Sequence, residues 1–327
     1  MNLNDRFNKL RENLKLDPQE RLRAEVFHNR LGELLIAAGV AKRTRLQGSL
    51  ARKTMLPPLK DIDKIIELVD DLRDLLTGPN GPRKAMGMIR DALAPHLPGV
   101  SFEIKKHALG ISVPGESFAF DAVPAFNPED GSRWIVIADT EDEAWEPSNT
   151  YVLIDTIAAR NQLCDGKFIH QVRMIKQACR QAGLAELLPG LHIETFAYAA
   201  ILKSIDHSDA VAKALRAGAD MLGSPYSDPT GVDQISDRLD ARNIATSKST
   251  MQRVANEAER AIVAARAGDE GGAATIWSDI FGDAFPRPNA GDRSYLEHLH
   301  RGGAVLPSAS TPRTPTTRAW RCPGSGW

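Results

Sequence analysis

Cysteine is scarce in this chain, and neither sign of charge is in excess. The 327 residues include three cysteines, Cys164, Cys179 and Cys322, whose spacing fits neither a metal site nor a disulfide framework. The formal net charge is −1, so no overall basic field indicates a long nucleic-acid partner, and any nucleotide site must be basic locally. We therefore expect a protein of a reducing, cytoplasmic compartment that does not bind long nucleic acids.

Long hydrophobic runs are absent as well. No apolar stretch approaches the roughly 20 residues that a membrane-spanning helix needs, and the first residues are polar and charged. Hydrophobic residues still make up 42% of the chain, and this length is enough for two lobes with a sizeable core. These observations predict a soluble globular protein without a membrane partner.

A Gly-Ser pair follows a predicted strand that ends at Gln47. A tight turn at Gly48 and Ser49 leaves backbone N–H groups and one hydroxyl free to hold a triphosphate, because oriented amides bind anions. Arg52 and Lys53 are either solvated surface charges or further phosphate contacts, and the sequence leaves both readings open. The segment is thus a candidate nucleotide-binding site.

Two aspartates follow closely, separated by one apolar residue in a predicted strand. Asp61 and Asp63 project from the same face of that strand, roughly 7 Å apart at the backbone. An isolated Asp-Ile-Asp is more often a solvated strand end than a metal site, so the pair alone carries little weight. After a Gly-Ser turn, however, it predicts carboxylates that hold divalent cations beside a triphosphate.

A third carboxylate stands alone in an apolar strand. Asp121 is the lone acid in the segment from Phe118 to Pro124. A charge buried among apolar neighbours is costly unless it is paired or bound to a metal ion. Transfer of an α-phosphoryl group to a hydroxyl uses two metal ions roughly 4 Å apart, which need hard oxygen ligands. Asp61, Asp63 and Asp121 are therefore the predicted catalytic residues and metal ligands.

In this order, the motifs resemble those of a known family, the nucleotidyltransferases of the polymerase-beta superfamily. Within it, the chain resembles the bacterial cGAS/DncV-like nucleotidyltransferases (CD-NTases, with the SMODS domain) of CBASS antiphage systems. The resemblance covers roughly residues 1–285 and rests on these segments: Gly48-Ser49 with Arg52 and Thr54, Asp61-Ile62-Asp63, Asp121-Ala122-Val123-Pro124, Phe168 to Arg180, Leu191-His192-Ile193-Glu194 and Asp228-Pro229-Thr230-Gly231.

The resemblance implies a reaction and its participants. NTPs, with ATP expected among them, are the substrates, and two Mg ions, replaceable by Mn, are the cofactors. The implied product is a cyclic di- or trinucleotide second messenger that activates a downstream effector during phage infection. A regulatory partner protein from the same operon is a further implied participant.

Family position also assigns individual side chains. Gln47, Gly48, Ser49 and Arg52 are implied to bind the nucleotide. Lys176 is implied to reach its phosphates, although the Lys176 stem could simply snorkel along an apolar helix face. Gly190 departs from the pattern, because many relatives carry a nucleotide-contacting serine at that point. The choice of base therefore cannot be carried over.

Two other functions stay open. A transferase could add NMP to RNA, to a small molecule such as an antibiotic, or to a protein; the near-neutral charge argues mildly against RNA. A non-catalytic nucleotide-binding scaffold is the other reading. The complete set of three carboxylates argues against a scaffold, since loss of one acid would be its simplest signature.

Periodicity predicts an α+β protein whose two lobes differ in character. Its first part has a helix from Pro18 to Gly39, another over Lys84–Leu93, and strands at Arg43–Gln47, Asp61–Ile66, between Ser101 and Ala125, and at Trp134–Ala138. Its second part has helical periods over Tyr151–Leu163, Lys167–Gln181, Ile193–Ile205, Ala210–Leu222, Thr250–Ala267 and Ala273–Phe281, with a loop at Ser224–Asp233.

We therefore expect a two-lobed, polymerase-beta-like nucleotidyltransferase with a mixed-sheet core and a helical second lobe. Residues 1–150 would form the catalytic lobe, including the N-terminal helix, and residues 151–285 the helical lobe. Residues 286–327 are rich in Pro, Ser, Thr and Gly, which predicts a disordered tail, apart from a short helix at Ser294–His300.

Overall fold

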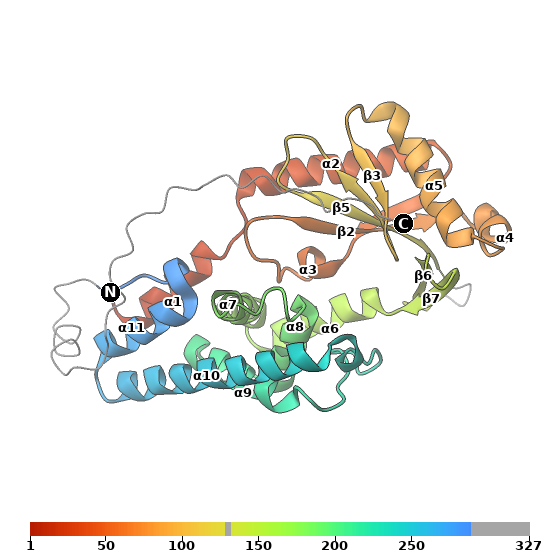
Figure 1. Ribbon diagram of the computed structural model, residues 1–327. Helices are drawn as coiled ribbons and strands as arrows, with labels where there is room; N and C mark the ends of the chain where they lie inside the picture. The colour runs from red at the N-terminus through yellow and green to blue at the C-terminus, as the bar shows by residue number, and fades with distance from the viewer. Residues whose placement is uncertain (128–131, 289–327) are drawn as a thin grey trace, which may run out of the picture.

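The computed structural model describes residues 1–127 and 132–288 of the protein. One half of the molecule is a sheet with helices along one side, and a group of helices forms the other half (Figure 1). Within the described residues the sheet has seven strands, in the order β1-β2-β5-β4-β3, with β6 and β7 added beside β5. The strands are β1 (Ala41–Leu46), β2 (Asp61–Leu68), β3 (Ser101–Ile104), β4 (Leu109–Ser112), β5 (Ala119–Phe126), β6 (Ile135–Asp139) and β7 (Ala144–Ser148).

The sheet is mixed, as predicted. β2 and β5 run parallel, whereas the other paired strands run antiparallel. β7 was not predicted, because Pro147 interrupts its sequence. Among the described residues that strand pairs only with β6, and an edge position of this kind tolerates proline.

One face of the sheet is covered by helix α2 (Pro18–Ala37) and helix α5 (Gly81–Leu93). The predicted start of α2 is confirmed: the carboxylate of Asp17 accepts a hydrogen bond from the backbone N–H of Glu20 at 2.8 Å. Ile62 and Ile66 of β2 pack into the same hydrophobic cluster as buried residues of both helices. This packing fixes which side of β2 is turned away from the helical half.

The other face of β2 carries its acidic residues, because side chains alternate along a strand. Asp61, Asp63, Ile65 and Glu67 share this face. Ile65 packs against Tyr151, at the start of the first helix of the helical half. The candidate catalytic acids therefore lie on the same face of β2 as its contacts with Tyr151 of the helical half.

The helical half is built around a second and larger hydrophobic cluster. Its helices are α6 (Thr150–Leu163), α7 (Phe168–Gln181), α8 (Gly190–Ala200), α9 (His207–Met221), α10 (Ala241–Arg266) and α11 (Glu270–Phe281). Helix α1 (Leu3–Asn13), which the sequence did not predict, joins them, since the ring of Phe7 lies 5.2 Å from that of Trp277. The first residues of the chain thus pack with its last described helix.

Some boundaries differ from the predictions. Helix α8 ends at Ala200 rather than at Ile205. Helix α10 begins at Ala241 rather than at Thr250, because the carboxylate of Asp240 caps it by accepting a hydrogen bond from the N–H of Asn243. The tail helix expected at 294–300 and most of the expected disordered tail lie outside the described residues. The division of the chain near residue 150 stays a prediction.

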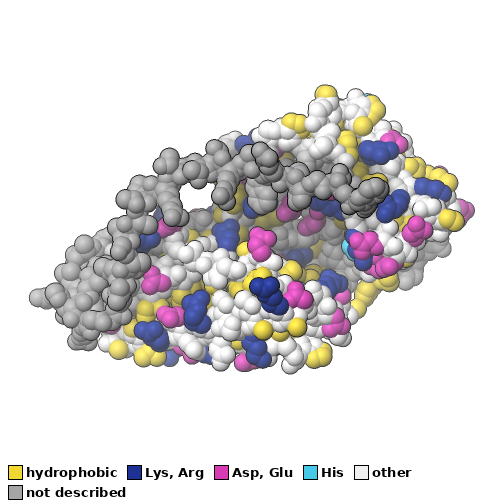
Figure 2. Space-filling model, in the orientation of Figure 1, with side chains coloured by type: hydrophobic (Ala, Val, Ile, Leu, Met, Phe, Trp, Pro, Cys, Tyr) yellow, Lys and Arg dark blue, Asp and Glu magenta, His cyan; other side chains and the backbone are white. Residues whose placement is uncertain are grey.

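The surface shows no dominant sign of charge on the side seen in Figure 2, where Lys and Arg alternate with Asp and Glu. This agrees with the formal net charge of −1. Among the residues that the structure describes, no helix combines the length and the apolar character that crossing a membrane would require.

Candidate active site

The Gly-Ser segment forms a single helical turn, α3 (Gly48–Ala51), that lies directly against β2. Gly48 has a φ of +67°, a left-handed conformation that favours glycine. A Cβ on Gly48 would lie 1.8 Å from Oδ2 of Asp63, so a side chain there would collide with the carboxylate. The N–H of Gln47 donates to the carbonyl of Asp63 at 2.9 Å. Turn and carboxylate are therefore held as one unit.

The three predicted acids converge on neighbouring parallel strands. The register between β2 and β5 places Asp63 directly beside Asp121, and Asp61 lies two residues earlier on the same face of β2. Asp61 is exposed, while Asp63 and Asp121 are partly buried. Lys105, just after β3, donates from its ammonium group to Oδ1 of Asp121 at 2.7 Å.

The electrostatics of Asp63 reflect this crowding. Burial raises the pKa of Asp63 to about 6, and the nearby carboxylates of Asp121 and Asp61 add to the rise, while Arg52 and Lys105 oppose it. A buried carboxylate beside two others is stabilised by a cation. The donor set consists of hard carboxylate oxygens, so the residues present fit divalent ions such as Mg.

A group of side chains away from the three aspartates has the geometry of a metal site. Among the described residues, ligand atoms of His107, Asp139 and Glu146 lie within 4.8 Å of one another. Asp139 already accepts from two backbone N–H groups, and the Lys106 ammonium lies 3.3 Å away. The three candidate aspartates do not form such a group, so their side chains must turn toward one another to share an ion.

Behind the Gly-Ser turn, a buried cluster of charges joins the two halves of the molecule. Glu194 of α8 is fully buried, and its carboxylate accepts from Arg52 Nε at 2.7 Å and from Arg52 Nη2 at 3.1 Å. The same carboxylate accepts from the Thr54 hydroxyl and from the Lys176 ammonium, each at 2.7 Å. Two cations and one hydroxyl therefore converge on a single carboxylate.

Two predicted nucleotide-binding residues lie in this cluster rather than in open solvent. Arg52 and Lys176 are 8% and 9% exposed. Burial lowers the pKa of Lys176, and Glu194 opposes that shift. Gly190 leaves the space that Lys176 uses, since a Cβ on Gly190 would lie 3.1 Å from the ammonium nitrogen. The roles of Arg52 and Lys176 toward a nucleotide stay predictions.

A cavity of about 270 Å³ opens at the carboxylates. Its lining includes Ser49, Lys60, Asp61, Asp63 and Arg180, so it brings the Gly-Ser turn, the two aspartates of β2 and a cation of α7 to one space, whereas Asp121 does not line it. The guanidinium of Arg180 donates to the carbonyl of Pro57 at 2.7 Å, which holds α7 against the loop before β2. This cavity is the candidate active site.

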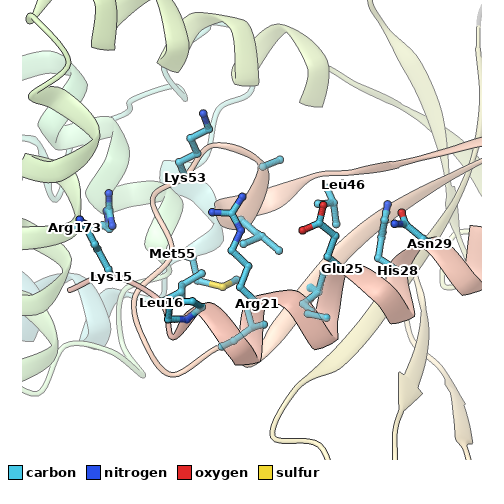
Figure 3. A pocket seen from close by; sticks show the side chains of 16 residues that line it. Lys15, Leu16, Arg21, Glu25, His28, Asn29, Leu46, Lys53, Met55 and Arg173 are labelled. Atoms are coloured by element: carbon cyan, nitrogen blue, oxygen red, sulfur yellow. The ribbon is translucent and has the colours of Figure 1, made fainter. Parts of the chain in front are cut away.

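A larger cavity, of about 670 Å³, lies on the other side of β2. The β2 residue that lines it is Ile62, whose side chain points away from the face that carries the aspartates. Figure 3 shows Lys15 and Arg173 at one end of it and His28 and Asn29 of α2 at the other. None of the three aspartates borders it. Size alone therefore does not identify the site of chemistry.

Sequence reasoning assigned no role to several residues of the site, among them Lys105 and Glu194. Glu194 carried a usable signal, because it is the lone acid in the apolar helix from Leu191 to Ala200, the same argument that identified Asp121. Lys105 carried none, because its partner depends on the pairing of β4 with β5, which the sequence does not reveal.

Comparison with known proteins agrees with this fold. Residues 1–161 match the model of SMODS, the Second Messenger Oligonucleotide or Dinucleotide Synthetase domain. The matched residues include α3, β2 and β5, which carry the Gly-Ser turn and the three aspartates. No curated protein gives a significant match to the chain.

Solved structures with a similar fold include three bacterial proteins. Escherichia coli CdnC, in a complex with HORMA-deltaN, has a TM-score of 0.65 and 18% identity, over 86% of this chain and 98% of its own. Bradyrhizobium diazoefficiens CdnG, a CD-NTase in complex with GTP, has a TM-score of 0.65 and 14% identity, over 84% of this chain and 96% of its own.

The third is Vibrio cholerae DncV, a cyclic AMP-GMP synthase in complex with the linear intermediate 5' pppA(3',5')pG. It has a TM-score of 0.57 and 18% identity, over 78% of this chain and 70% of its own. These similarities show a shared fold. Residues 1–161, just under half of the 327-residue chain, match the SMODS domain, and in sequence and fold the chain resembles the cGAS/DncV-like nucleotidyltransferases.

Proposed function

We propose that this chain is a cyclic oligonucleotide synthase of antiphage defence, which joins NTPs into a cyclic di- or trinucleotide second messenger. The observation that carries the proposal is the register of β2 and β5, which sets Asp63 beside Asp121. The Gly48 turn lies against the same carboxylate. A triphosphate held at that turn would have its phosphates at the edge of the three acids.

The chain's own residues bind and orient the substrate. Ser49 and the backbone N–H groups of the turn, with Gln47 and Gly48, hold the triphosphate, because oriented amides and hydroxyls match phosphate oxygens. Arg52 and Lys176 supply positive charge behind the turn. The second nucleotide lies in the cavity lined by Lys60 and Arg180, with its hydroxyl directed at the α-phosphorus.

Asp61, Asp63 and Asp121 would hold two divalent cations, of which Mg is the proposed physiological ion and Mn a substitute. When bound, such ions favour the deprotonated hydroxyl and neutralise the pyrophosphate that leaves. Lys105 would compete with such an ion for Asp121, since its ammonium lies 2.7 Å from Oδ1. Lys105 is 43% exposed at its side chain and is therefore able to turn away.

The proposed substrates and protein partners are taken by analogy from the proteins of similar fold. CdnG is solved with GTP, DncV with a linear adenine-guanine intermediate and CdnC with a HORMA protein. By this analogy, NTPs including ATP are the substrates, and a protein from the same operon regulates the enzyme. The product then acts on a separate effector in the cytoplasm.

Pyrophosphate release from single NTPs and from pairs of NTPs tests this proposal. The purified protein should release pyrophosphate only with Mg or Mn present, and should do so without any added acceptor. Release that requires an added RNA, small molecule or protein would favour the transferase reading. Nucleotide binding without release, with the regulatory protein also supplied, would favour the scaffold reading.

A further inference from the structure

The phosphate-binding turn is attached to the helical half through side chains that follow it. Thr54, 0% exposed, donates its hydroxyl proton to Glu194 at 2.7 Å and accepts a longer contact of 3.4 Å from Lys176. Its backbone N–H donates to the carbonyl of Ser49 at 2.9 Å. Thr54 therefore joins the turn itself to a carboxylate of α8.

Arg52 makes the second attachment from the same short segment. Its guanidinium forms a two-point contact with the Glu194 carboxylate, which fixes orientation as well as distance. The N–H of Arg52 donates to the carbonyl of Gly48 at 3.2 Å, so its backbone closes the turn. Both side chains that anchor α3 thus end on one buried carboxylate of the other half.

We infer that Glu194 is a positioning residue, which holds the Gly48–Ser49 turn in its binding geometry from across the two halves through Arg52 and Thr54. The inference rests on the proposed function, because it concerns the triphosphate that the turn would hold. A turn of four residues has few contacts of its own, and a turn held by fixed partners loses less conformational entropy when a ligand binds. Loss of the anchor should therefore weaken triphosphate binding.

Thr54→Val provides the test, since valine keeps the shape of threonine and removes only the hydroxyl. Thr195→Val is the matched control. Thr195 adjoins Glu194 and is equally buried, but its hydroxyl donates within its own helix, to the carbonyl of Leu191. Thr54→Ser keeps the hydroxyl and should restore binding. Glu194→Gln tests the carboxylate itself, and its melting temperature separates misfolding from loss of the anchor.

The full chain would be titrated calorimetrically with inorganic triphosphate in the presence of Mn, a probe that does not depend on the base. Thr54→Val should raise Kd about tenfold, the size of one lost hydrogen bond to a charged group. Thr195→Val and Thr54→Ser should bind like the wild type. Steady-state kinetics with NTPs should show the loss in KM rather than in kcat.

Equal affinity of wild type and Thr54→Val would overturn the inference and leave the proposed function intact. An equal loss of triphosphate affinity in Thr54→Val and Thr195→Val would also overturn the inference, because the effect would then be a general destabilisation of the fold. Absence of any triphosphate binding by the wild type would overturn the proposed function together with the inference that rests on it.

Discussion

The guanidinium of Arg52 and the carboxylate of Glu194 form a two-point ion pair between the two halves of the molecule, at 2.7 and 3.1 Å. Arg52 directly follows the Gly-Ser turn, and Glu194 lies in α8 of the helical half. The pair is buried, so its charges are screened little by solvent. The phosphate-binding turn and the helical half are thereby linked in structure and in energy.

Breaking this pair should destabilise the fold. Glu194→Ala leaves the Arg52 and Lys176 cations buried without their anion, which typically costs about 3–5 kcal/mol of unfolding free energy. Glu259→Ala is the control, because Glu259 pairs with Arg216 at a half-exposed site, where such pairs contribute at most about 1 kcal/mol. Urea denaturation measures both values. Similar losses in the two variants would contradict the assigned importance of burial.

The contribution of Glu194 should also depend on pH in a defined direction. Burial alone would raise the pKa of Glu194, but Lys176 and Arg52 lower it from an ordinary value of 4.5 to about 2. The folded state thus favours the ionised form, whose contribution to stability is complete above pH 4.5 and is lost as the pH falls toward 2.

Glu194→Gln lacks this titration. The difference in unfolding free energy between wild type and Glu194→Gln should therefore shrink as the pH falls from about 5 to about 2. Urea denaturation at several pH values measures that difference. A gap that stays constant over this range would show that Glu194 is not held ionised by its two cations.

Glycine at position 48 should be essential for the site. Gly48→Ala strains a positive φ and also places a Cβ 1.8 Å from the Asp63 carboxylate, so activity should be lost. Gly39→Ala is the matched control: its φ is +69°, but no atom lies within 4 Å of the added Cβ. It should cost only the backbone strain, about 1–2 kcal/mol, and keep activity. Pyrophosphate release measures activity, and urea denaturation measures stability. If both variants remained active, the predicted clash between a Cβ at position 48 and the Asp63 carboxylate would be refuted.

Removal of the paired carboxylates should abolish catalysis and preserve the fold. Asp61→Ala with Asp63→Ala should reduce product formation by at least about 100-fold, because the ligands of the proposed ions are lost. Asp70→Ala with Asp71→Ala makes the same change of charge at exposed positions just beyond the other end of β2. That control should retain full activity. Undiminished synthesis in the first double variant would refute the assignment of the carboxylates.

Lys105 should compete with metal ions for Asp121. Lys105→Met removes the ammonium 2.7 Å from Asp121, so Mn should bind several-fold more tightly than to the wild type. Asp121→Asn should instead weaken binding, since it removes a ligand. Calorimetric titration with Mn measures both effects. Weaker Mn binding by Lys105→Met would indicate that the lysine supports the site rather than competing for it.

Much of the fold was accessible from sequence because local signals agreed. The Asp17 cap, the alternation in β2 and β5, and the helical periods after residue 150 all lie within single elements, where neighbouring residues determine the conformation. Helix α1 was missed because its surface is largely polar and its two buried apolar residues, Phe7 and Leu10, pack against distant helices. A helix that is stabilised by residues far away in the sequence carries no signal in its own sequence.

The site divides in the same way. Residue types identified Asp61, Asp63 and Asp121, but the pairing of Asp63 with Asp121 depends on strand register, which is a long-range property. The partners of Arg52 and Lys176 were likewise hidden, because Glu194 is 142 residues from Arg52 in sequence. The chemistry of the site could therefore be predicted, because it depends on residue type. The geometry could not, because it depends on contacts between elements that lie far apart in the sequence.

The most direct test of the central claim is mass spectrometry of the products formed from all four NTPs with Mg or Mn, after phosphatase treatment. A cyclic di- or trinucleotide has no terminal phosphate and survives this treatment intact. The proposed function predicts such a product from the wild type and none from the Asp61→Ala, Asp63→Ala variant. Linear products alone, or NMP attached to another acceptor, would contradict cyclic second-messenger synthesis.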